Sequence, residues 1–210
     1  STPDPGSTHP VQQFNVLSGV SCPSAKACVA VGYFNKRLPA GERPLAIAWN
    51  GTSWRLRSAA GQNGELASLS CSRPSRCLAV GAVTSAGGLP TQPLAQLWNG
   101  QAWTLHWPVG TGLGTAGHLD GVSCSGLAAC QATGGYSTSG GRVRALAEIW
   151  NGASWRRVSA ASPSPAFSEL YSIDCTSAVH CLAVGERATQ LPLAELWNGS
   201  RWRVLTPVNP

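Results

Sequence analysis

Acidic, imidazole and phenol side chains recur in this sequence at fixed distances from pairs of cysteines. They stand six or four residues before the first cysteine of a pair, or just after the glycine that follows the second. The members able to hydrogen-bond a ligand are Tyr33, Glu65, His118, Asp120, Tyr136, Glu169, Tyr171 and Glu186. Carboxylates accept hydrogen bonds, whereas phenol and imidazole groups also donate them, a mixture suited to sugar hydroxyls or a peptide backbone. We predict that these eight residues bind a ligand; the alternative is that they are only solvated loop ends.

Catalysis by the same side chains is a competing hypothesis. Glu65, Glu169 and Glu186 could supply the carboxylate pair of a small glycan hydrolase, and His118 with Asp120 could form half of a proton relay. The chain contains no Gly-x-Ser-x-Gly nucleophile elbow and no zincin motif. The sequence therefore favours a binding role, and we assign no catalytic residue.

Eight cysteines form four pairs, each separated by five residues. The pairs are Cys22 and Cys28, Cys71 and Cys77, Cys124 and Cys130, and Cys175 and Cys181. Zinc sites favour closer Cys-x2-Cys pairs with further ligands, so we predict no metal site from the cysteines. One disulfide within each repeat is the simpler interpretation, and persistent disulfides are typical of secreted proteins. A channel-bound cation such as calcium stays open, and no cofactor is predicted.

The cysteine pairs belong to a repeat of about 50 residues that occurs four times. Each copy ends in Trp-Asn-Gly-x-x-Trp, beginning at Trp49, Trp98, Trp150 and Trp197. Short runs of period two, bounded by Gly, Pro, Ser or Asn, predict four antiparallel strands per copy. We predict an all-β, four-bladed β-propeller with one disulfide inside each blade. A sandwich, a trefoil-like barrel and a solenoid fit the repeat less well.

The repeat also sets the predicted domain boundaries. The blades are expected at about 15–59, 64–107, 117–160 and 168–206 of a single domain spanning 1–210, after an extended segment 1–13. Ser-Thr-Pro-Asp-Pro-Gly at the start is typical of a mature chain after removal of a signal peptide. We expect the four blades to close within one chain. The alternative is that two chains build one larger ring.

Eight of the nine tryptophans lie in the repeated motif, and we expect them to pack between blades rather than to form a sugar platform. Trp107 lies outside the motif and is a candidate contact residue. The repeated Asn-Gly predicts a tight hairpin with positive φ values. This turn chemistry explains Asn50 and Asn198 better than N-glycosylation does.

The two ends of each predicted blade differ in character. At one end lie the cysteine loop and the Asn-Gly turn, which are short and repeated. At the other end lie the loops 33–43, 82–92 and 135–144, which vary in length and composition. Variable loops on a rigid scaffold are where binding usually occurs. We therefore expect the predicted ligand-binding residues to ring the mouth of the channel at the variable end.

The charge pattern limits the possible partners. The formal net charge is +6, but Arg55, Arg57, Arg156 and Arg203 alternate with other residues on the predicted outer strands. Charges on an exposed edge discourage strand addition, and nucleic-acid binding requires a clustered basic stripe with stacking aromatics. The pattern predicts no nucleic-acid partner, and attraction to anionic cell-wall polymers is a weaker possibility. No apolar run is long enough for a membrane span.

The combination Val-Ser-Cys-x5-Cys-x-Ala-Val-Gly, followed by Pro-Leu-Ala-x-x-Trp-Asn-Gly-x-x-Trp, resembles the repeats of secreted actinobacterial (Streptomyces-like) β-propeller proteins over residues 15–206. Some members of that group resemble lectins, including the propeller-type lectin subunits of umbrella toxin particles. The resemblance implies lectin-like binding of a cell-surface or cell-wall glycan. A protein-binding adaptor in a larger secreted toxin complex is the alternative.

Overall fold

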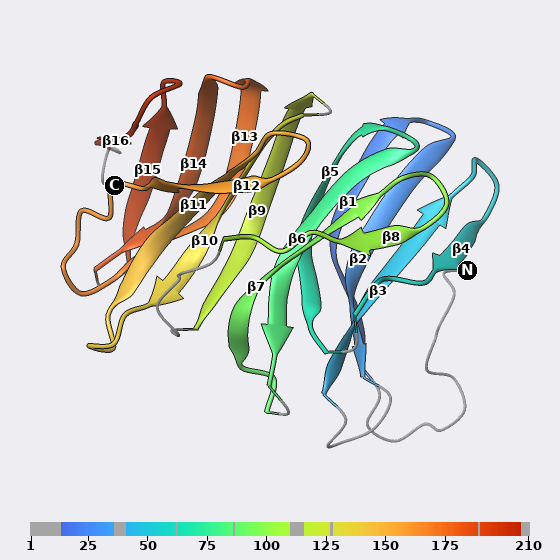
Figure 1. Cartoon of the computed structure of the whole chain (residues 1–210), viewed down its shortest axis with the longest axis horizontal. Helices are drawn as coiled ribbons and strands as arrows, with labels where there is room; N and C mark the ends of the chain where they lie inside the picture. Colours follow the sequence, from blue (N-terminus) through green and yellow to red (C-terminus); the bar gives the residue numbers. More distant parts are fainter. Residues whose placement is uncertain are drawn as a thin grey trace. The chain divides into compact units, whose positions relative to one another are not determined.

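The computed structural model describes residues 14–35, 41–61, 63–85, 87–109, 116–126, 128–188 and 190–206, which hold sixteen strands and no helix (Figure 1). No helix in these ranges is long and apolar enough to cross a membrane. The strands form four antiparallel sheets of four strands, each in chain order, which we call blades 1 to 4. The predicted extended segment 1–13 lies outside the described residues.

Each blade is a meander of long inner strands and a short outer strand. Blade 1 comprises β1 (Asn15–Ser24), β2 (Ala27–Asn35), β3 (Glu42–Trp49) and β4 (Trp54–Arg57). Blade 2 comprises β5 (Glu65–Arg73), β6 (Arg76–Thr84), β7 (Pro90–Trp98) and β8 (Trp103–Leu105). Blade 3 comprises β9 (Gly117–Gly126), β10 (Ala129–Ser137), β11 (Val143–Trp150) and β12 (Trp155–Ser159). Blade 4 comprises β13 (Ser168–Ser177), β14 (His180–Arg187), β15 (Leu191–Trp197) and β16 (Trp202–Leu205).

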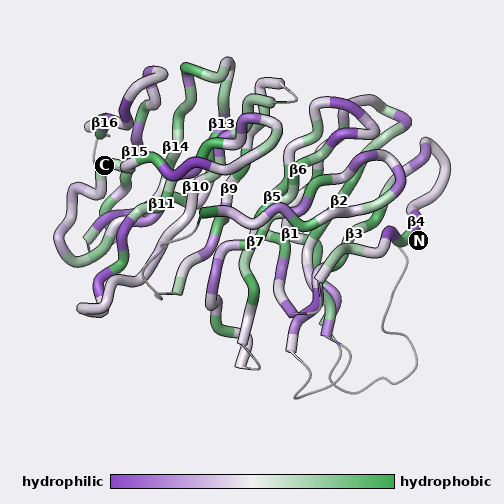
Figure 2. Tube along the Cα trace, in the orientation of Figure 1, coloured by the Kyte–Doolittle hydropathy of each residue, from purple (hydrophilic) through white to green (hydrophobic). Residues whose placement is uncertain are grey.

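The chain divides into two compact units, Ser1–Trp107 with blades 1 and 2 and Pro108–Pro210 with blades 3 and 4. In the first unit, Val29, Val31 and Ala46 of blade 1 pack with Leu66 and Leu69 of blade 2. The equivalent faces pack in the second unit, where Ala147 of blade 3 contacts a cluster containing Leu170 and Ile173 of blade 4. Figure 2 shows hydrophobic residues along the strands and hydrophilic residues at many turns. Each unit is therefore a pair of blades joined by one apolar interface.

The four predicted disulfides are all present, one in each blade, between the first and second strands. No free cysteine occurs in the described residues. Four such bonds are typical of proteins that fold in an oxidising, extracellular type of compartment.

The tryptophan pairs occupy the packed side of the blades, as the repeat predicts. The six tryptophans of blades 2, 3 and 4 are buried, whereas Trp49 and Trp54 of blade 1 are half-buried. Each pair faces across a hairpin with ring centroids 5.5 to 5.7 Å apart and tilted planes. The pairs are therefore core residues, while Trp107 is 54% exposed.

The prediction of a tight Asn-Gly hairpin with positive φ values is wrong in one respect. Because Trp49 pairs with Trp54, the loop contains four residues, and only Gly51 adopts positive φ, at 95°. Asn50 Oδ1 instead accepts hydrogen bonds from the backbone N–H groups of Thr52 and Ser53 at 3.0 and 2.9 Å. The asparagine is thus required for its side-chain oxygen, which closes the loop as a local cap. The same arrangement recurs in the other three blades.

The cysteine loop and the Asn-Gly loop lie together at one end of each blade. In blade 1 the Cα of Gly51 lies so close to Lys26 that an added Cβ would be 3.2 Å from its side chain. The corresponding glycines of the other blades approach Ser75, Ala128 and Val179 in the same way. The predicted pairing of these two loops is therefore correct, and the variable loops lie at the opposite strand ends.

Candidate functional site

A β-bulge in the first strand of each blade determines where the predicted site residues lie. The strand register skips one residue at Ser18, Ala67, Asp120 and Tyr171. The bulge residue has no cross-strand partner, and it disturbs the simple alternation of inward and outward side chains. In blade 3 Leu119 is buried, while His118 and Asp120 on either side of it approach each other outside the core. The bulge thus adds a second polar residue to the end of the strand.

Three of the predicted residues meet in the second unit. His118 Nε2 lies 2.6 Å from Glu169 Oε1 and 3.2 Å from Asp120 Oδ2, which joins β9 of blade 3 to β13 of blade 4. All three side chains are partly buried. One carboxylate from the same strand, Asp120, and one from the neighbouring blade, Glu169, therefore face the imidazole.

This surrounding fixes the charge of the imidazole. Burial acts to lower the pKa of His118, but hydrogen bonds and charges from Asp120 and Glu169 outweigh it and raise the pKa to about 10. His118 is therefore a cation at neutral pH. Because the folded-state pKa exceeds the ordinary 6.5, the charge contributes stability that is complete below pH 6.5 and is lost as the pH rises through about 10.

Glycine at position 135 makes the approach of Glu169 possible. Gly135 pairs with His118 in the β9–β10 register, and a Cβ at Gly135 would lie 2.5 Å from Glu169 Oε1. No side chain could be added there without moving the carboxylate. The absence of a side chain at Gly135 thus leaves the space that the Glu169 carboxylate occupies.

Tyr171 and Glu186 extend the cluster along blade 4. Tyr171 donates a hydrogen bond to Glu186 Oε2 at 3.2 Å, and Glu186 Oε1 accepts one from Gln190 N at 3.0 Å. Burial, followed by the Glu169 charge and the hydrogen bond to Glu186, raises the pKa of Tyr171 to about 12. The phenol therefore keeps its proton, and its ring is substantially exposed. We call His118, Asp120, Glu169, Tyr171 and Glu186 the acidic cluster.

Part of the acidic cluster has the side-chain types of a metal site. One possible ligand atom from each of His118, Asp120 and Glu169 lies within 4.8 Å of the others. Imidazole nitrogen and carboxylate oxygen ligate zinc, while calcium takes oxygen ligands. The hydrogen bonds among the three groups involve these same atoms, so an ion would have to replace them and the proton on His118.

The first unit contains a simpler version of the same arrangement. Tyr33 of blade 1 and Glu65 of blade 2 stand at the repeat positions of Gly135 and Glu169. Burial, with the charges of Glu42 and Glu65, raises the pKa of Tyr33. The structure therefore divides the predicted residues between two units, with five in the acidic cluster and two in the first unit.

The eighth predicted residue lies elsewhere. Tyr136 is on β10, with the guanidinium carbon of Arg157 4.3 Å from its ring centroid. It lines a cavity with Arg144 and the linker that follows β12, and none of the acidic cluster lines that cavity. The adjacency of Tyr136 to Gly135 in sequence does not bring its side chain into the acidic cluster.

The repeat also contains a buried polar position that sequence reasoning missed. Two residues before the first motif tryptophan stand Gln96, Glu148 and Glu195, all fully buried, where blade 1 has Ile47. Gln96 accepts a hydrogen bond from Ala60 N at 2.8 Å and donates one to Ala60 O at 2.9 Å. Glu195 accepts one from Ala161 N at 2.9 Å. These side chains hold the linkers between blades, and a polar residue inside an apolar strand was the available signal.

Glu195→Gln is expected to stabilise the protein by about 1 kcal/mol at neutral pH, because the amide can donate the second hydrogen bond that Gln96 makes. Burial raises the pKa of Glu195. A raised folded-state pKa contributes stability below the ordinary value of 4.5 that is lost as the pH rises through the folded value. The gain from glutamine should therefore grow from pH 4 to pH 7 in urea unfolding curves. An equal or negative difference at both pH values would contradict the assignment.

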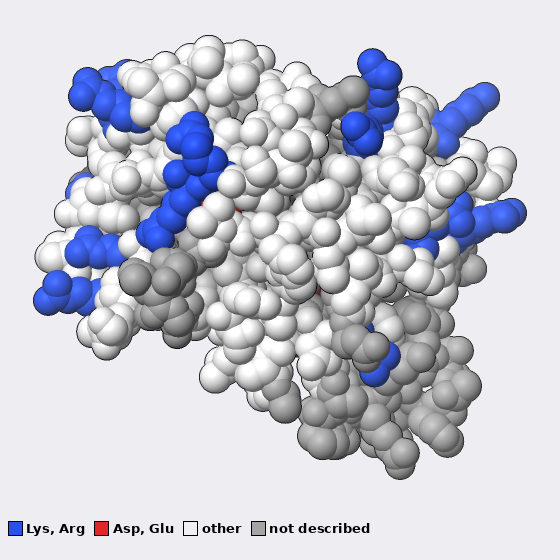
Figure 3. Space-filling view, viewed as in Figure 1, with Lys and Arg blue, Asp and Glu red and all other residues white. Residues whose placement is uncertain are grey.

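The basic side chains of the described residues lie in separate groups on the face shown in Figure 3. Arg55, Arg57, Arg156 and Arg203 are exposed on the outer strands β4, β12 and β16. This arrangement agrees with the predicted role of arginine at the blade edges.

Comparison with known proteins shows likeness of fold only. No protein-family model matches the chain, and no curated protein matches it. A solved structure of YCF48 bound to D1 peptide is similar with a TM-score of 0.53 and 12% identity, covering 97% of this chain and 58% of that one. An Aleuria aurantia lectin mutant in complex with alpha-methyl-L-fucoside has a TM-score of 0.52 and 12% identity, covering 85% and 56%. The mercury derivative of the fucose-specific lectin from Aleuria aurantia gives 0.51 and 12%, covering 84% and 55%.

The chain thus spans little more than half the length of these solved chains. Each of its four four-stranded antiparallel sheets resembles a blade of a propeller protein, and propeller lectins are among the similar structures. An all-β fold of propeller-like blades, each with its own disulfide, is the conclusion that the structure and these comparisons share.

Proposed function

We propose that this protein is a secreted, non-catalytic recognition module that binds a glycan of a cell surface or cell wall through the acidic cluster. The observation that carries the proposal is the convergence of an imidazolium, three carboxylates and an exposed phenol at the variable end of blades 3 and 4. Carboxylates that accept hydrogen bonds from sugar hydroxyls, beside a phenol ring for stacking, suit a saccharide. The fold likeness to fucoside-bound lectins agrees with this class of ligand.

The proposal includes the architecture around the cluster. In this proposal the four blades belong to one propeller domain, and Tyr33 and Glu65 are the ligand-binding residues of its first unit. The repeat and the likeness to propeller proteins support this arrangement. A single shallow site of this kind binds modestly, and arraying copies in a larger secreted assembly would increase avidity.

A glycan array probed with the purified protein, once with calcium and once with EDTA, tests the function. For the best glycan, Glu169→Ala and Tyr171→Ala should each weaken binding about tenfold or more, since hydrogen bonds to charged groups contribute roughly 1.5–3 kcal/mol. Tyr171→Ala should change the melting temperature by no more than a few degrees, whereas Glu169→Ala also removes a partner of the His118 cation, so its binding is compared per folded molecule. Loss of binding in EDTA would assign an ion to His118, Asp120 and Glu169.

Lys26→Ala is the matched control, because Lys26 is exposed in the cysteine loop at the opposite end of the blade. Its binding should equal that of the wild type. Glycan binding that survives Glu169→Ala and Tyr171→Ala but is lost in Lys26→Ala would reverse the assignment of the two ends.

A protein-binding adaptor in a larger secreted complex is the second candidate, supported by the likeness to YCF48, whose structure contains a bound peptide. Such an adaptor would bind an extended segment through the same groups. Failure of every glycan, together with capture of a peptide from a peptide array that depends on Glu169, would favour the adaptor.

A further inference from the structure

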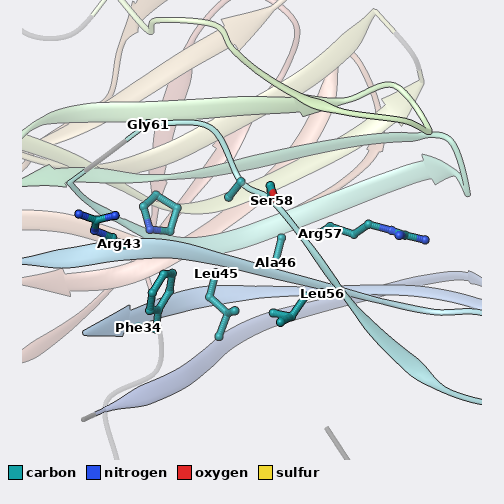
Figure 4. Close-up of a pocket in the computed structure, with 10 residues that line it drawn as sticks. Phe34, Arg43, Leu45, Ala46, Leu56, Arg57, Ser58 and Gly61 are labelled. Atoms are coloured by element: carbon teal, nitrogen blue, oxygen red, sulfur yellow. The ribbon is translucent and has the colours of Figure 1, made fainter. Parts of the chain in front are cut away.

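Two cavities outside the acidic cluster occupy corresponding places in blades 1 and 3. The blade 1 cavity is about 240 Å³ and is lined by Phe34, Arg43, Pro44, Leu45, Ala46, Leu56, Arg57, Ser58, Ala59 and Gly61 (Figure 4). The blade 3 cavity is about 260 Å³ and is lined by Tyr136, Arg144, Ala145, Arg157, Val158, Ser159, Ala160, Ala161 and Ser162. Aligned on the repeat, most lining positions coincide. The two cavities are therefore copies of one pocket.

An aromatic ring beside an arginine is the common frame of both cavities. Phe34 pairs with Arg43 across β2 and β3, and Tyr136 pairs with Arg144 across β10 and β11. The same register position holds Val83 and Gln92 in blade 2, and Arg187 and Leu191 in blade 4. The frame thus occurs in the first blade of each unit and not in the second.

The linker that closes each cavity is held in place by the next blade. Gln96 binds the backbone of Ala60 beside the blade 1 cavity, and Glu195 binds Ala161 in the wall of the blade 3 cavity. In blade 3, Ser162 has a φ of 38° and its hydroxyl accepts a hydrogen bond from Ala145 N at 3.0 Å. A serine held in the left-handed region by its own hydrogen bond indicates a wall with one defined shape.

The polar groups in the two cavities differ in number. In blade 1, Arg43 Nε is buried with no hydrogen-bond partner among the described residues, Leu56 is apolar, and Arg57 projects away from Phe34 in Figure 4. In blade 3, Arg157 stands at the repeat position of Leu56, and its guanidinium group stacks on the ring of Tyr136. Arg144 is anchored by the carbonyls of Ser162 and Ser164 at 3.4 and 3.1 Å. The blade 3 cavity is thus lined by two guanidinium groups and by no acidic residue.

We propose that the blade 3 cavity binds the oxyanion group, a carboxylate or a sulfate, of an acidic saccharide, with Arg144 and Arg157 as its donors and Tyr136 as its wall. Guanidinium groups donate paired hydrogen bonds to planar carboxylates and to sulfate-like oxyanions. The cavity is smaller than the roughly 300–1,000 Å³ of drug-sized sites, which suits one substituted sugar ring. The blade 1 cavity is also lined by two arginines, Arg43 and Arg57, but Arg57 projects away from Phe34 and Leu56 stands where blade 3 has the stacked arginine, so we expect it to bind charged sugars more weakly.

This inference rests on the proposed glycan-binding function and makes it specific. The acidic cluster would bind hydroxyl groups, and the blade 3 cavity would select chains that carry negative charge. The acidic cluster and the blade 3 cavity both lie in the second unit. In this proposal one acidic oligosaccharide binds the acidic cluster through its hydroxyl groups and the cavity through its oxyanion group.

The test is a titration of the ¹⁵N-labelled protein, followed by NMR, with methyl glucuronide, glucose 6-sulfate and methyl glucoside. The two charged sugars should shift the amide signals around Arg144 and Arg157, and the neutral sugar should bind there at least tenfold more weakly. Arg157→Leu should weaken charged-sugar binding about tenfold or more, given the strength of hydrogen bonds between charged groups. Leucine is the residue that blade 1 already carries at this position.

Arg156→Leu is the matched control, because it removes the same charge from an adjacent, exposed residue outside the cavity. It should change the affinity less than twofold. Leu56→Arg should give the blade 1 cavity new affinity for the charged sugars, which keeps the test decisive should Arg157→Leu not fold.

Two results would overturn the inference. One is equal binding of glucuronide and glucoside that Arg157→Leu does not affect. The other is inorganic sulfate binding as tightly as glucose 6-sulfate, which would show a general anion site rather than a saccharide site. Either result, with array binding still lost in Glu169→Ala, would leave the proposed function intact; an array without any Glu169-dependent glycan would remove that function separately.

Discussion

Trp98→Ala is expected to lower the free energy of unfolding by about 3–5 kcal/mol, the range for truncating a large buried aromatic. Trp98 is 6% exposed and lies in the cluster that joins blade 1 to blade 2, with Val31 and Leu94 among its members. Its ring centroid is 5.5 Å from that of Trp103. Removing the ring leaves a cavity at the interface that holds the first unit together, so the loss includes both transfer and cavity contributions.

Trp107→Ala is the matched control in the same unit, because this side chain is 54% exposed. It should change stability by no more than about 0.5 kcal/mol, as surface substitutions usually do. Urea unfolding monitored by circular dichroism measures both variants. Glycan binding per folded molecule should be unchanged in Trp98→Ala. A fully stable Trp98→Ala that has lost its ligand would instead make the tryptophans a recognition surface.

Gly185→Ala is expected to destabilise the protein at the upper end of the roughly 1–3 kcal/mol found for overpacking, or beyond it. A Cβ on Gly185 would lie far inside van der Waals contact distance of the carbonyl oxygen of Glu169 and of the backbone of Leu170. Backbone atoms cannot rotate away as a side chain can. The strand β13 would have to separate from β14 at the bulge, which would also displace the Glu169 side chain.

Gly126→Ala provides the control for this prediction. Gly126 lies at the end of β9, does not have positive φ, and its added Cβ would meet only Ala129 Cβ at 3.9 Å. Alanine there should be neutral or slightly stabilising, because it reduces the freedom of the unfolded chain. Thermal unfolding of the two variants provides the comparison. Equal melting temperatures would show that the glycine after the second cysteine is not required by packing.

The glycine at position 185 illustrates what the repeat could and could not predict. A glycine recurs four residues after the second cysteine of each pair, and this recurrence identifies a constrained backbone position. The reason for that constraint is the bulge opposite, which brings the backbone of β13 against it. A bulge depends on pairing between two strands, so no property of one strand's sequence specifies it.

The same distinction applies to the Asn-Gly turn and to the linkers. The sequence located the turn correctly, but the turn type depends on Trp49 pairing with Trp54, which leaves four loop residues with positive φ only at the glycine. Gln96 and Glu195 are visible in the sequence as polar residues inside apolar strands, but their function appears only when the linker of the preceding blade lies against them. Hydrogen bonds between residues more than thirty positions apart are products of blade packing.

The sequence by itself determined the elements of this protein: four repeats, four strands in each, a disulfide in each blade, tryptophan pairs on the packed side and a variable end that carries polar residues. These features follow from local periodicity and from the spacing of identical residues, and both can be read along the linear sequence without knowledge of which strands pack together. Only the tertiary structure decided which polar residues meet. His118, Asp120 and Glu169 come together because a bulge displaces Asp120 and because Gly135 leaves room for a carboxylate from the neighbouring blade. Tyr136, adjacent to that glycine in sequence, points instead to a cavity with two arginines, because successive residues on a strand face opposite sides.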